Sequence, residues 1–351
     1  MLDRLFHQLA FSTRPAQQSL AYLEDRLFKS KLDPVTPGSP VFVTGLPRAG
    51  TTLLLEILES SGEFCAHTYQ DMPFILTPLL WEEMAAKFRK KIELQERAHG
   101  DGMMVSMESP EAFEEVLWAS FWPKQYHKDH VDVWNPRFSF SEFEQFFNQH
   151  IKKIAHLRRP DLASPRYLSK NNMNISRIDY IAKIFPSARI VIPFRHPFEQ
   201  SASLLRQHTN FLAIHKEDAF AKSYMRAIGH YDFGENLKPI NMGGWLDKHT
   251  DLSPTTLEFW LQYWVSSYRS LLKNQNTATL FSYDHFCRQP KDSLKKLADW
   301  VGLDNNEAVI SQADRISPPK PYSAKDYEIS KELLNDAMEL FEEMSAAAVN
   351  S

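Results

Sequence analysis

A segment bounded by two glycines combines residue types that could bind an anion. Four residues separate Gly45 from Gly50, and Arg48 is one of them. A β-branched and aromatic run at residues 41–44 precedes the segment, and an apolar helix is predicted after it, at residues 51–60. Backbone N–H groups at the start of a helix point at an anion, and the helix dipole adds a favourable field. The predicted phosphate contacts are Pro47, Arg48, Ala49, Gly50, Thr51 and Thr52.

The residue that carries the positive charge in this segment, and its position, differ from those in a nucleoside-triphosphate loop. Such a loop requires a lysine after the second glycine, but Thr51 and Thr52 follow here and Arg48 supplies the charge. Arginine keeps its charge and offers a planar fork suited to phosphate or sulfate oxygens. A donor with one 5′ phosphate and a transferable group therefore fits this loop, and no metal is expected. The alternative is a tight strand–helix turn with an exposed arginine.

A second pair of residues suits another phosphate. Arg195 follows a predicted strand at residues 188–194, Pro197 is suited to a first helical turn, and Ser203 lies about two turns into that helix. Ligands of open α/β sheets collect at the carboxyl ends of the strands. We expect Arg195 and Ser203 to bind a phosphate separate from the first one. The alternative is a helix-start arginine and an ordinary surface serine.

Strands that alternate with helices predict an α/β fold with a parallel central sheet. Further strands are expected at residues 167–170 and 279–283, each followed by a helix, and Lys170 ends the first of these two strands. The chain is read as one domain over residues 1–351, with an N-terminal helix and linker at residues 1–40. A helical insertion at residues 81–165 and an irregular segment at residues 229–258 are expected to cover an acceptor site.

Composition excludes several classes of protein. The 351 residues carry 40 basic and 44 acidic side chains, a net charge of −4, which argues against a nucleic-acid partner. Cys65 and Cys287 form no disulfide framework or metal motif, which fits a reducing compartment. The apolar runs are too short for a transmembrane segment, and no signal peptide is expected. A cytoplasmic location follows as an expectation, and the oligomeric state is not readable.

The two motifs resemble those of the sulfotransferases that use 3′-phosphoadenosine 5′-phosphosulfate. Residues 47–52 look like the 5′-phosphosulfate loop, in the form of the tyrosylprotein and bacterial branches. Residues 194–197 with Ser203 resemble the 3′-phosphate motif, and residues 281–286 with 300–303 resemble a later strand–helix unit. The resemblance implies a P-loop-like fold and transfer of a sulfuryl group from 3′-phosphoadenosine 5′-phosphosulfate to a hydroxyl or amine. Small molecules, carbohydrates and peptides remain open as acceptors.

The resemblance also implies catalytic roles. Arg48 would stabilise charge on the leaving phosphate, and Lys170 resembles a basic residue held over the donor sulfate. The position of the family's acidic general base matches Asp71, which is one methylene shorter than glutamate. A helix-capping role for Asp71 and a base role for His67 are the alternatives. An acidic group could also reach the acceptor: Glu108, Glu111, Glu114 and Glu115.

Several assignments remain open at this stage. Aromatic residues could stack on an acceptor (Trp118, Trp122, Trp134 and Trp245) or on adenine (Tyr263, Trp264 and Tyr268), although core packing would also explain them. A loop at residues 315–323 could close over the 3′-phosphate. The competing functions are a P-loop kinase or nucleotide hydrolase, which would need magnesium, and a catalytically silent nucleotide-binding protein.

Overall fold

A parallel five-stranded sheet forms the centre of the computed structural model, in the order β2-β5-β1-β6-β7. The structure describes residues 7, 10–85, 95–96, 104–105, 109–111, 113–272, 278–317 and 329–351. The strands of this sheet are β1 (Val41–Val43), β2 (Phe64–Cys65), β5 (Arg166–Lys170), β6 (Arg189–Phe194) and β7 (Thr279–Ser282). The predicted α/β class with a parallel sheet is confirmed.

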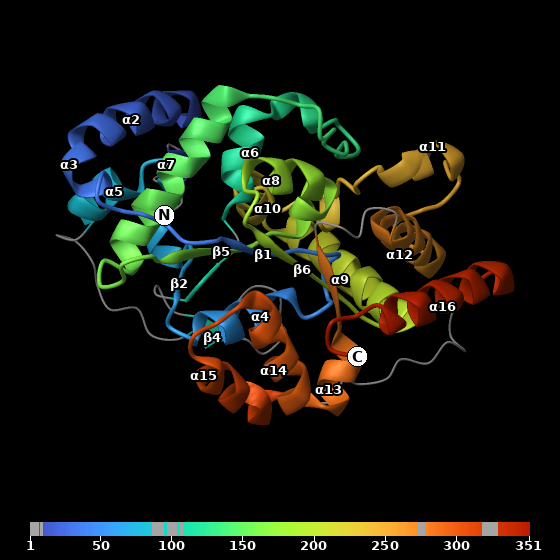
Figure 1. Ribbon diagram of the computed structural model, residues 1–351. Coiled ribbons are helices and arrows are strands. Elements are labelled where there is room, and N and C mark those ends of the chain that lie inside the picture. The colour runs from blue at the N-terminus through green and yellow to red at the C-terminus, as the bar shows by residue number, and fades with distance from the viewer. Residues whose placement is uncertain are drawn as a thin grey trace.

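Helices cover both faces of the sheet, as Figure 1 shows. The N-terminal half contributes α2 (Arg14–Leu27), α3 (Lys29–Leu32), α4 (Thr51–Glu59), α5 (Pro78–Ala85), α6 (Glu115–Phe121) and α7 (Ser141–Arg158). The middle contributes α8 (Ile178–Ile184), α9 (Pro197–Glu217), α10 (Ala219–Ala227), α11 (Trp245–Lys248) and α12 (Leu257–Leu272). The C-terminal part contributes α13 (Tyr283–Arg288), α14 (Pro290–Val301), α15 (Asn306–Ile310) and α16 (Lys331–Ala346).

Two hydrophobic cores lie on opposite faces of the sheet because side chains alternate along each strand. In β1, Phe42 belongs to the larger core beneath α7, α8 and α12, whereas Val41 and Val43 belong to the core beneath α4 and α14. The same alternation in β6 divides Ile190 and Ile192 from Val191. All six of these side chains are at most 3 % exposed, so the central strands are held from both sides.

The register of the sheet brings the carboxyl ends of its strands to one edge. Val43 pairs with Lys170 on one side of β1 and with Val191 on the other. The loop after β1, the end of β5 and the turn after β6 therefore meet at this edge, as does the turn after β7, whose last residue Ser282 pairs with Phe194. Arg48, Lys170 and Arg195 all come from these connections, so the topology places the predicted chemistry together.

Several predicted elements differ in detail from the observed ones. The helix expected after Lys170 is split into a 3₁₀ turn, Asn172–Ser176, and α8, and Asn171 caps the turn instead of Asn172 or Asn174. The insertion at residues 81–165 also contains a two-stranded antiparallel pair, β3 (Gln95–Glu96) and β4 (Met104–Val105), that was not expected. The irregular segment at residues 229–258 contains the short helix α11.

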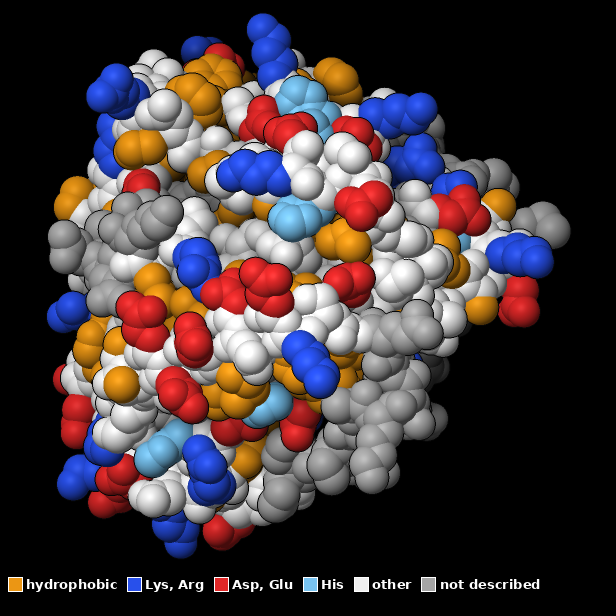
Figure 2. Space-filling view, turned by 90° about the vertical axis from the view of Figure 1, so that its right-hand side faces the viewer, with side chains coloured by type: hydrophobic (Ala, Val, Ile, Leu, Met, Phe, Trp, Pro, Cys, Tyr) orange, Lys and Arg blue, Asp and Glu red, His pale blue; other side chains and the backbone are white. Residues whose placement is uncertain are grey.

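The surface that carries α11, α12 and α16 mixes both signs of charge. Figure 2 shows this face, where the described Lys and Arg side chains are interspersed with Asp and Glu side chains. Of the helices that the structure describes, none combines the length and hydropathy that crossing a bilayer requires.

Candidate active site

A cavity of about 250 Å³ opens at the carboxyl edge of the sheet. Its polar wall includes Arg48, Thr51, Thr52, Glu111, Glu115, Lys170, Asn171, Asn172, His230 and Asp232. Its apolar wall includes Phe113, Met173, Tyr224, Met225, Ile228 and Phe233. The predicted Arg48, Lys170 and two threonines thus share one cavity with acidic groups that could accept a proton.

The loop after β1 is shaped by close backbone packing. A Cβ on Gly45 would lie 2.8 Å from the carbonyl oxygen of Pro193, and a Cβ on Gly50 would lie 2.6 Å from the ring of Tyr283. Gly50 also has φ = +85° and is the residue before the first turn of α4. Arg48 has φ = +70°, a left-handed conformation that is uncommon for residues other than glycine. The loop therefore holds Arg48 in a costly conformation at the cavity.

The two predicted anion motifs meet directly. The Arg48 Nε donates a hydrogen bond to the Ser203 Oγ of α9 over 3.1 Å, although 155 residues separate them in the chain. The Arg195 guanidinium lies 5.8 Å from the centre of the Tyr283 ring, the same ring that packs against Gly50. Arg195 also donates to Glu199 over 2.6 Å. Tyr283 therefore packs against both the loop and Arg195, although Arg195 is buried and is not among the residues that line the cavity.

Gln200 holds these motifs in a fixed relation. Its Nε2 donates to the carbonyl oxygens of Leu46 (3.1 Å) and Pro47 (3.0 Å) in the loop. Its Oε1 accepts from the backbone N–H of Arg195 (3.2 Å) and from the indole N–H of Trp264 (3.0 Å). Both amide protons and both acceptor positions of this fully buried side chain are used. Sequence reasoning missed Gln200, because nothing in its local pattern indicates these distant partners.

The segment after β5 packs against the loop after β1 through hydrogen bonds of Asn172. Asn172 accepts hydrogen bonds from Thr44 at its carbonyl oxygen and from Thr51 at its side-chain oxygen, both over 3.3 Å. Its side-chain amide donates to Asp232 over 3.0 Å. This residue thus connects the loop after β1 to residues 229–233, the part of the irregular segment that lines the cavity. Lys170, two residues earlier at the end of β5, lines the same cavity.

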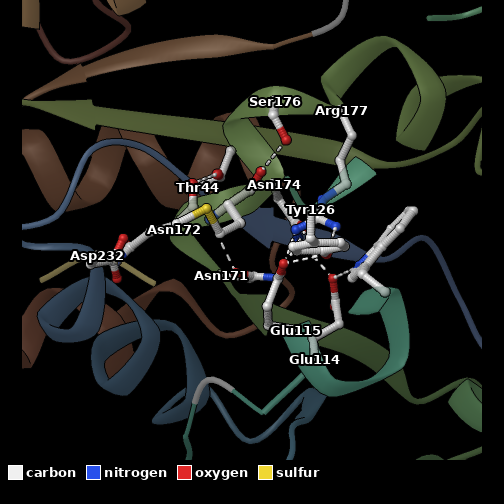
Figure 3. A network of polar contacts seen from close by, with 12 residues as sticks. Thr44, Glu114, Glu115, Tyr126, Asn171, Asn172, Asn174, Ser176, Arg177 and Asp232 are labelled. Atoms are coloured by element: carbon white, nitrogen blue, oxygen red, sulfur yellow. Dashed lines mark hydrogen bonds and ion pairs between the residues drawn. The ribbon is translucent and has the colours of Figure 1, made fainter. Parts of the chain in front are cut away.

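A buried network of charges supports the cavity floor (Figure 3). Glu115 accepts hydrogen bonds from Asn171 (2.7 Å) and Tyr126 (2.5 Å) and pairs with Arg177. The Arg177 guanidinium lies between the rings of Trp118 and Trp134, 4.3 and 4.6 Å from their centres. Glu114 accepts from Trp118, Tyr167 and Asn174 within the same network. Both charges of the Arg177–Glu115 pair are buried, so removing one partner would leave the other uncompensated.

Asp71 lies in a separate buried cluster and is not among the residues that line the cavity. Its carboxylate accepts from the backbone N–H of Thr68 (2.9 Å) and contacts His67 Nδ1 (3.1 Å) and Arg158. Together, Asp71 and Thr68 form a capping box around the turn Tyr69–Asp71. Burial would raise the pKa of Asp71, but the His67 hydrogen bond and the Arg158 charge outweigh it and lower the pKa below its usual value. The contacts of Asp71 are therefore those of the helix-capping role, the alternative to its role as a base.

The other proton-acceptor candidates divide between the cavity and the interior. His67 is buried between Asp71 and His150, and Glu114 lies in the network below the floor. Glu111 and Glu115 line the cavity, and the Tyr69 hydroxyl donates to Glu111 over 2.5 Å. Glu108 lies outside the described residues. Sequence reasoning missed two cavity groups, His230 and Asp232, and burial lowers the pKa of His230 below its usual value.

The aromatic candidates are core residues. Trp118 and Trp134 enclose Arg177, Trp245 stacks on Tyr263 at 5.3 Å, and Trp122 packs against Phe138; none of these tryptophans lines the cavity. Trp264 donates to Gln200, and the Tyr268 hydroxyl donates to the carbonyl oxygen of Pro193. The expected closing loop at residues 315–323 lies largely outside the described residues.

Comparisons with known proteins place these observations in a family context. A model of the sulfotransferase family matches residues 40–240, more than half of the chain. The solved structure of sulfotransferase STF9 from Mycobacterium avium is similar over 92 % of this chain and 80 % of that one, with 13 % identity and a TM-score of 0.51. Sulfotransferase STF1 from Mycobacterium tuberculosis H37Rv shows 13 % identity over 96 % and 85 %, with a TM-score of 0.48. No curated protein matches the chain significantly.

Because Gln200 uses all of its polar atoms, we expect replacement by an apolar side chain of similar size to lower the stability of the protein strongly. Gln200→Leu leaves the Leu46 and Pro47 carbonyls and two N–H donors without their partner. We expect the free energy of unfolding to fall by at least about 1–3 kcal/mol, the cost of unsatisfied buried polar groups. Denaturant titration measures this, with Gln262→Leu on the outer part of α12 as the matched control. Equal midpoints for the two variants would contradict the account.

The lowered pKa of Asp71 predicts a pH-dependent stability. A carboxylate with a lowered pKa in the folded state stabilises the protein above its unfolded pKa, about 3.9. That contribution is lost as the pH falls through the lower folded value. We therefore expect Asp71→Asn to destabilise the protein most at neutral pH, with a difference that shrinks below about pH 4. Thermal unfolding across pH, with the exposed Asp33→Asn as control, measures this; a pH-independent difference would refute it.

Proposed function

The chain belongs to the sulfotransferase family, and we propose that it takes its sulfuryl group from 3′-phosphoadenosine 5′-phosphosulfate. The observation that carries this proposal is the 3.1 Å hydrogen bond from Arg48 to Ser203. It supports a single nucleotide site, because it joins the loop suited to the 5′-phosphosulfate to the helix suited to the 3′-phosphate. The absence of a lysine after Gly50 separates this site from that of a nucleoside-triphosphate enzyme.

Each end of the donor has its own set of residues in this proposal. Residues 47–52 would receive the 5′-phosphosulfate, through backbone N–H groups at the start of α4 and the guanidinium of Arg48. Arg195 and Ser203 would receive the 3′-phosphate. The contacts of Gln200 with both elements support a fixed spacing between the two anions. Preorganisation of this kind avoids the cost of arranging the charges after the nucleotide arrives.

Sulfuryl transfer breaks one bond and forms another. The acceptor oxygen or nitrogen attacks the sulfur, the bond from sulfur to the bridging oxygen of the 5′-phosphate breaks, and adenosine 3′,5′-bisphosphate leaves. Negative charge grows on that bridging oxygen as the bond lengthens. We assign Arg48 to this oxygen and Lys170 to the sulfuryl oxygens, because both side chains line the cavity. Fixed positive charge at the site where negative charge develops lowers the barrier.

The acceptor must also lose a proton, and we assign its removal to Glu111. This residue lines the cavity with Arg48 and Lys170, whereas Asp71 is enclosed by Thr68, His67 and Arg158. Glu115 faces the same space, but Arg177 already neutralises its charge. The hydroxyl of Tyr69 donates to Glu111 over 2.5 Å, which orients the carboxylate. Asp71 as the base remains the prediction of the sequence pattern, and the two assignments are separable by mutation.

The apolar wall of the cavity favours a small acceptor with a hydrophobic body. Phe113, Tyr224 and Phe233 would contact that body, and the polar wall would hold its nucleophilic group near the donor sulfur. Gly229 presses against Glu115, since a Cβ there would lie 2.5 Å from the Glu115 Cγ. The turn at residues 229–233 therefore closes directly onto the cavity floor, consistent with a covering role for this end of the irregular segment.

Removing the Arg48 side chain should weaken the binding of the nucleotide product. We expect Arg48→Ala to reduce the affinity for adenosine 3′,5′-bisphosphate by about 1.5–3 kcal/mol, the scale of a hydrogen bond to a charged group. Isothermal titration calorimetry measures this. The control is Arg189→Ala, which removes an arginine from the opposite end of β6. Unchanged affinity in a folded Arg48→Ala protein would count against the donor assignment.

The two candidate bases predict different outcomes. Glu111→Gln should lower turnover by about 10²–10⁴-fold, the usual contribution of a general base, with little change in the affinity for adenosine 3′,5′-bisphosphate. Asp71→Asn should mainly lower stability and leave turnover per folded molecule close to normal. Initial rates with labelled donor, corrected for the folded fraction, measure both. Full activity in Glu111→Gln together with loss in Asp71→Asn would return the base to Asp71.

A further inference from the structure

A small hairpin outside the cavity presents three metal-binding side chains on one face. It lies between α6 and α7, at the upper right of Figure 1. The backbone N–H of His127 donates to the His130 carbonyl (2.9 Å), Tyr126 and Val131 form an antiparallel bridge, and the N–H of Asp132 donates to the carbonyl of Gln125 (2.9 Å). Only two residues, 128 and 129, connect the two sides.

Alternation along the hairpin separates its two faces. Val131 is fully buried, and Tyr126 reaches Glu115 and Arg177 in the interior. The neighbouring positions therefore point the other way, and they are His127, His130 and Asp132. Their side chains retain 44, 23 and 44 % exposure, so a dissolved ion can reach them.

The ligand atoms of these three residues converge. His127 Nε2 lies 2.8 Å from one Asp132 oxygen, and His130 Nε2 lies 3.3 Å from the other. The two imidazole rings are stacked, with centres 4.4 Å apart. All three ligand atoms lie within 4.8 Å of one another, and among the described residues no other group of three or more His, Cys, Asp or Glu side chains shares this property. Ligands around one zinc ion, bound at about 2.0–2.2 Å, have separations in this range.

Asp129 adds the second contact that a metal-binding histidine usually makes. Its carboxylate lies 2.8 Å from His130 Nδ1, the ring nitrogen that faces away from Asp132. Histidine ligands commonly donate this other N–H to a carboxylate, which fixes the tautomer and directs the remaining nitrogen at the metal. The contact therefore orients Nε2 of His130 toward the same point as His127 and Asp132.

We propose that His127, His130 and Asp132 form a surface site for a divalent cation of the zinc class, with Asp129 as a positioning residue. Two imidazoles and a carboxylate are a ligand set that suits zinc, and water or another ligand would complete the tetrahedron. The carboxylates of Asp129 and Asp132 offset the cation's charge. Lys238 is one nearby cation, and its ammonium donates to the His127 carbonyl oxygen, on the backbone side of the turn.

A bound cation would connect the hairpin to the cavity floor. The inner face of the hairpin holds Tyr126, whose hydroxyl donates to Glu115 and accepts from Arg177 (Figure 3). A cation that joins residues 127, 130 and 132 would therefore stabilise the segment that supports Glu115. The site itself lies outside the cavity and does not depend on the identity of the sulfuryl donor.

Metal titration of the tag-free full-length chain tests this site. Chelator-treated protein is titrated with Zn²⁺ by calorimetry and with Co²⁺ by visible absorption, which reports tetrahedral coordination. We expect one ion per chain, loss of binding in His130→Ala and in Asp132→Asn, and an affinity about 10-fold or more lower in Asp129→Asn. The melting temperature should rise with Zn²⁺ in the unmodified chain and stay unchanged in His130→Ala and in Asp132→Asn.

The control is His249→Ala, which removes a histidine that follows α11 and does not belong to the hairpin. It should bind Zn²⁺ like the unmodified chain. Because these side chains point outward, we expect each hairpin variant to remain folded. Circular dichroism and binding of adenosine 3′,5′-bisphosphate check this. Absence of Zn²⁺ binding in the unmodified chain, or equal binding in the chain and in a folded His130→Ala protein, would overturn the proposal.

Discussion

The hydrogen bonds of Gln200 connect the two elements on which the rest of the site depends. Its side-chain oxygen accepts a hydrogen bond from the backbone N–H of Arg195, in the turn after β6. Its side-chain nitrogen donates to two backbone carbonyls of the loop after β1. Because the side chain is fully buried and every polar atom is paired, neither element can move without breaking a bond in a nonpolar environment. Arg48 then reaches Ser203 across the same junction. Parallel strands bring the elements to one edge, and Gln200 sets their spacing.

Sequence reasoning could name those residues of the candidate site whose signal is local, and their roles stay predictions. Gly45, Arg48 and Gly50 stand out because a strand, a tight turn and a helix need adjacent residues in a fixed order, and Arg195 stands at the end of a strongly apolar strand. Lys170 was found for the same reason. Gln200, Asn172, His230 and Asp232 have no such signal, because their roles come from partners on elements far away in the chain. Asp71 is the opposite case: the family resemblance suggests a base at this position, but the contacts of its carboxylate are those of a helix cap.

Buried charge supports the cavity in a way that composition could not reveal. Arg177 is enclosed by Trp118 and Trp134, two residues that suggested acceptor contacts, and it pairs with Glu115 at the floor of the cavity. Such a pair is costly to desolvate, and its benefit is a single well-defined geometry for Asn171 and the floor of the cavity. The hairpin at residues 125–132 reaches this network through Tyr126. Its outward His-x-x-His-x-Asp pattern is a signal that sequence inspection could have found.

We propose that the two arginine-containing elements bind opposite ends of one nucleotide. Calorimetric titration of the unmodified chain and of Arg195→Ala, each with adenosine 3′,5′-bisphosphate and with adenosine 5′-phosphate, tests it most directly. The account predicts that Arg195→Ala loses about tenfold or more of its affinity for the bisphosphate, the effect of one charged hydrogen bond, and keeps its affinity for the 5′-phosphate. Equal affinities of the unmodified chain for the two nucleotides, unchanged in the variant, would contradict it.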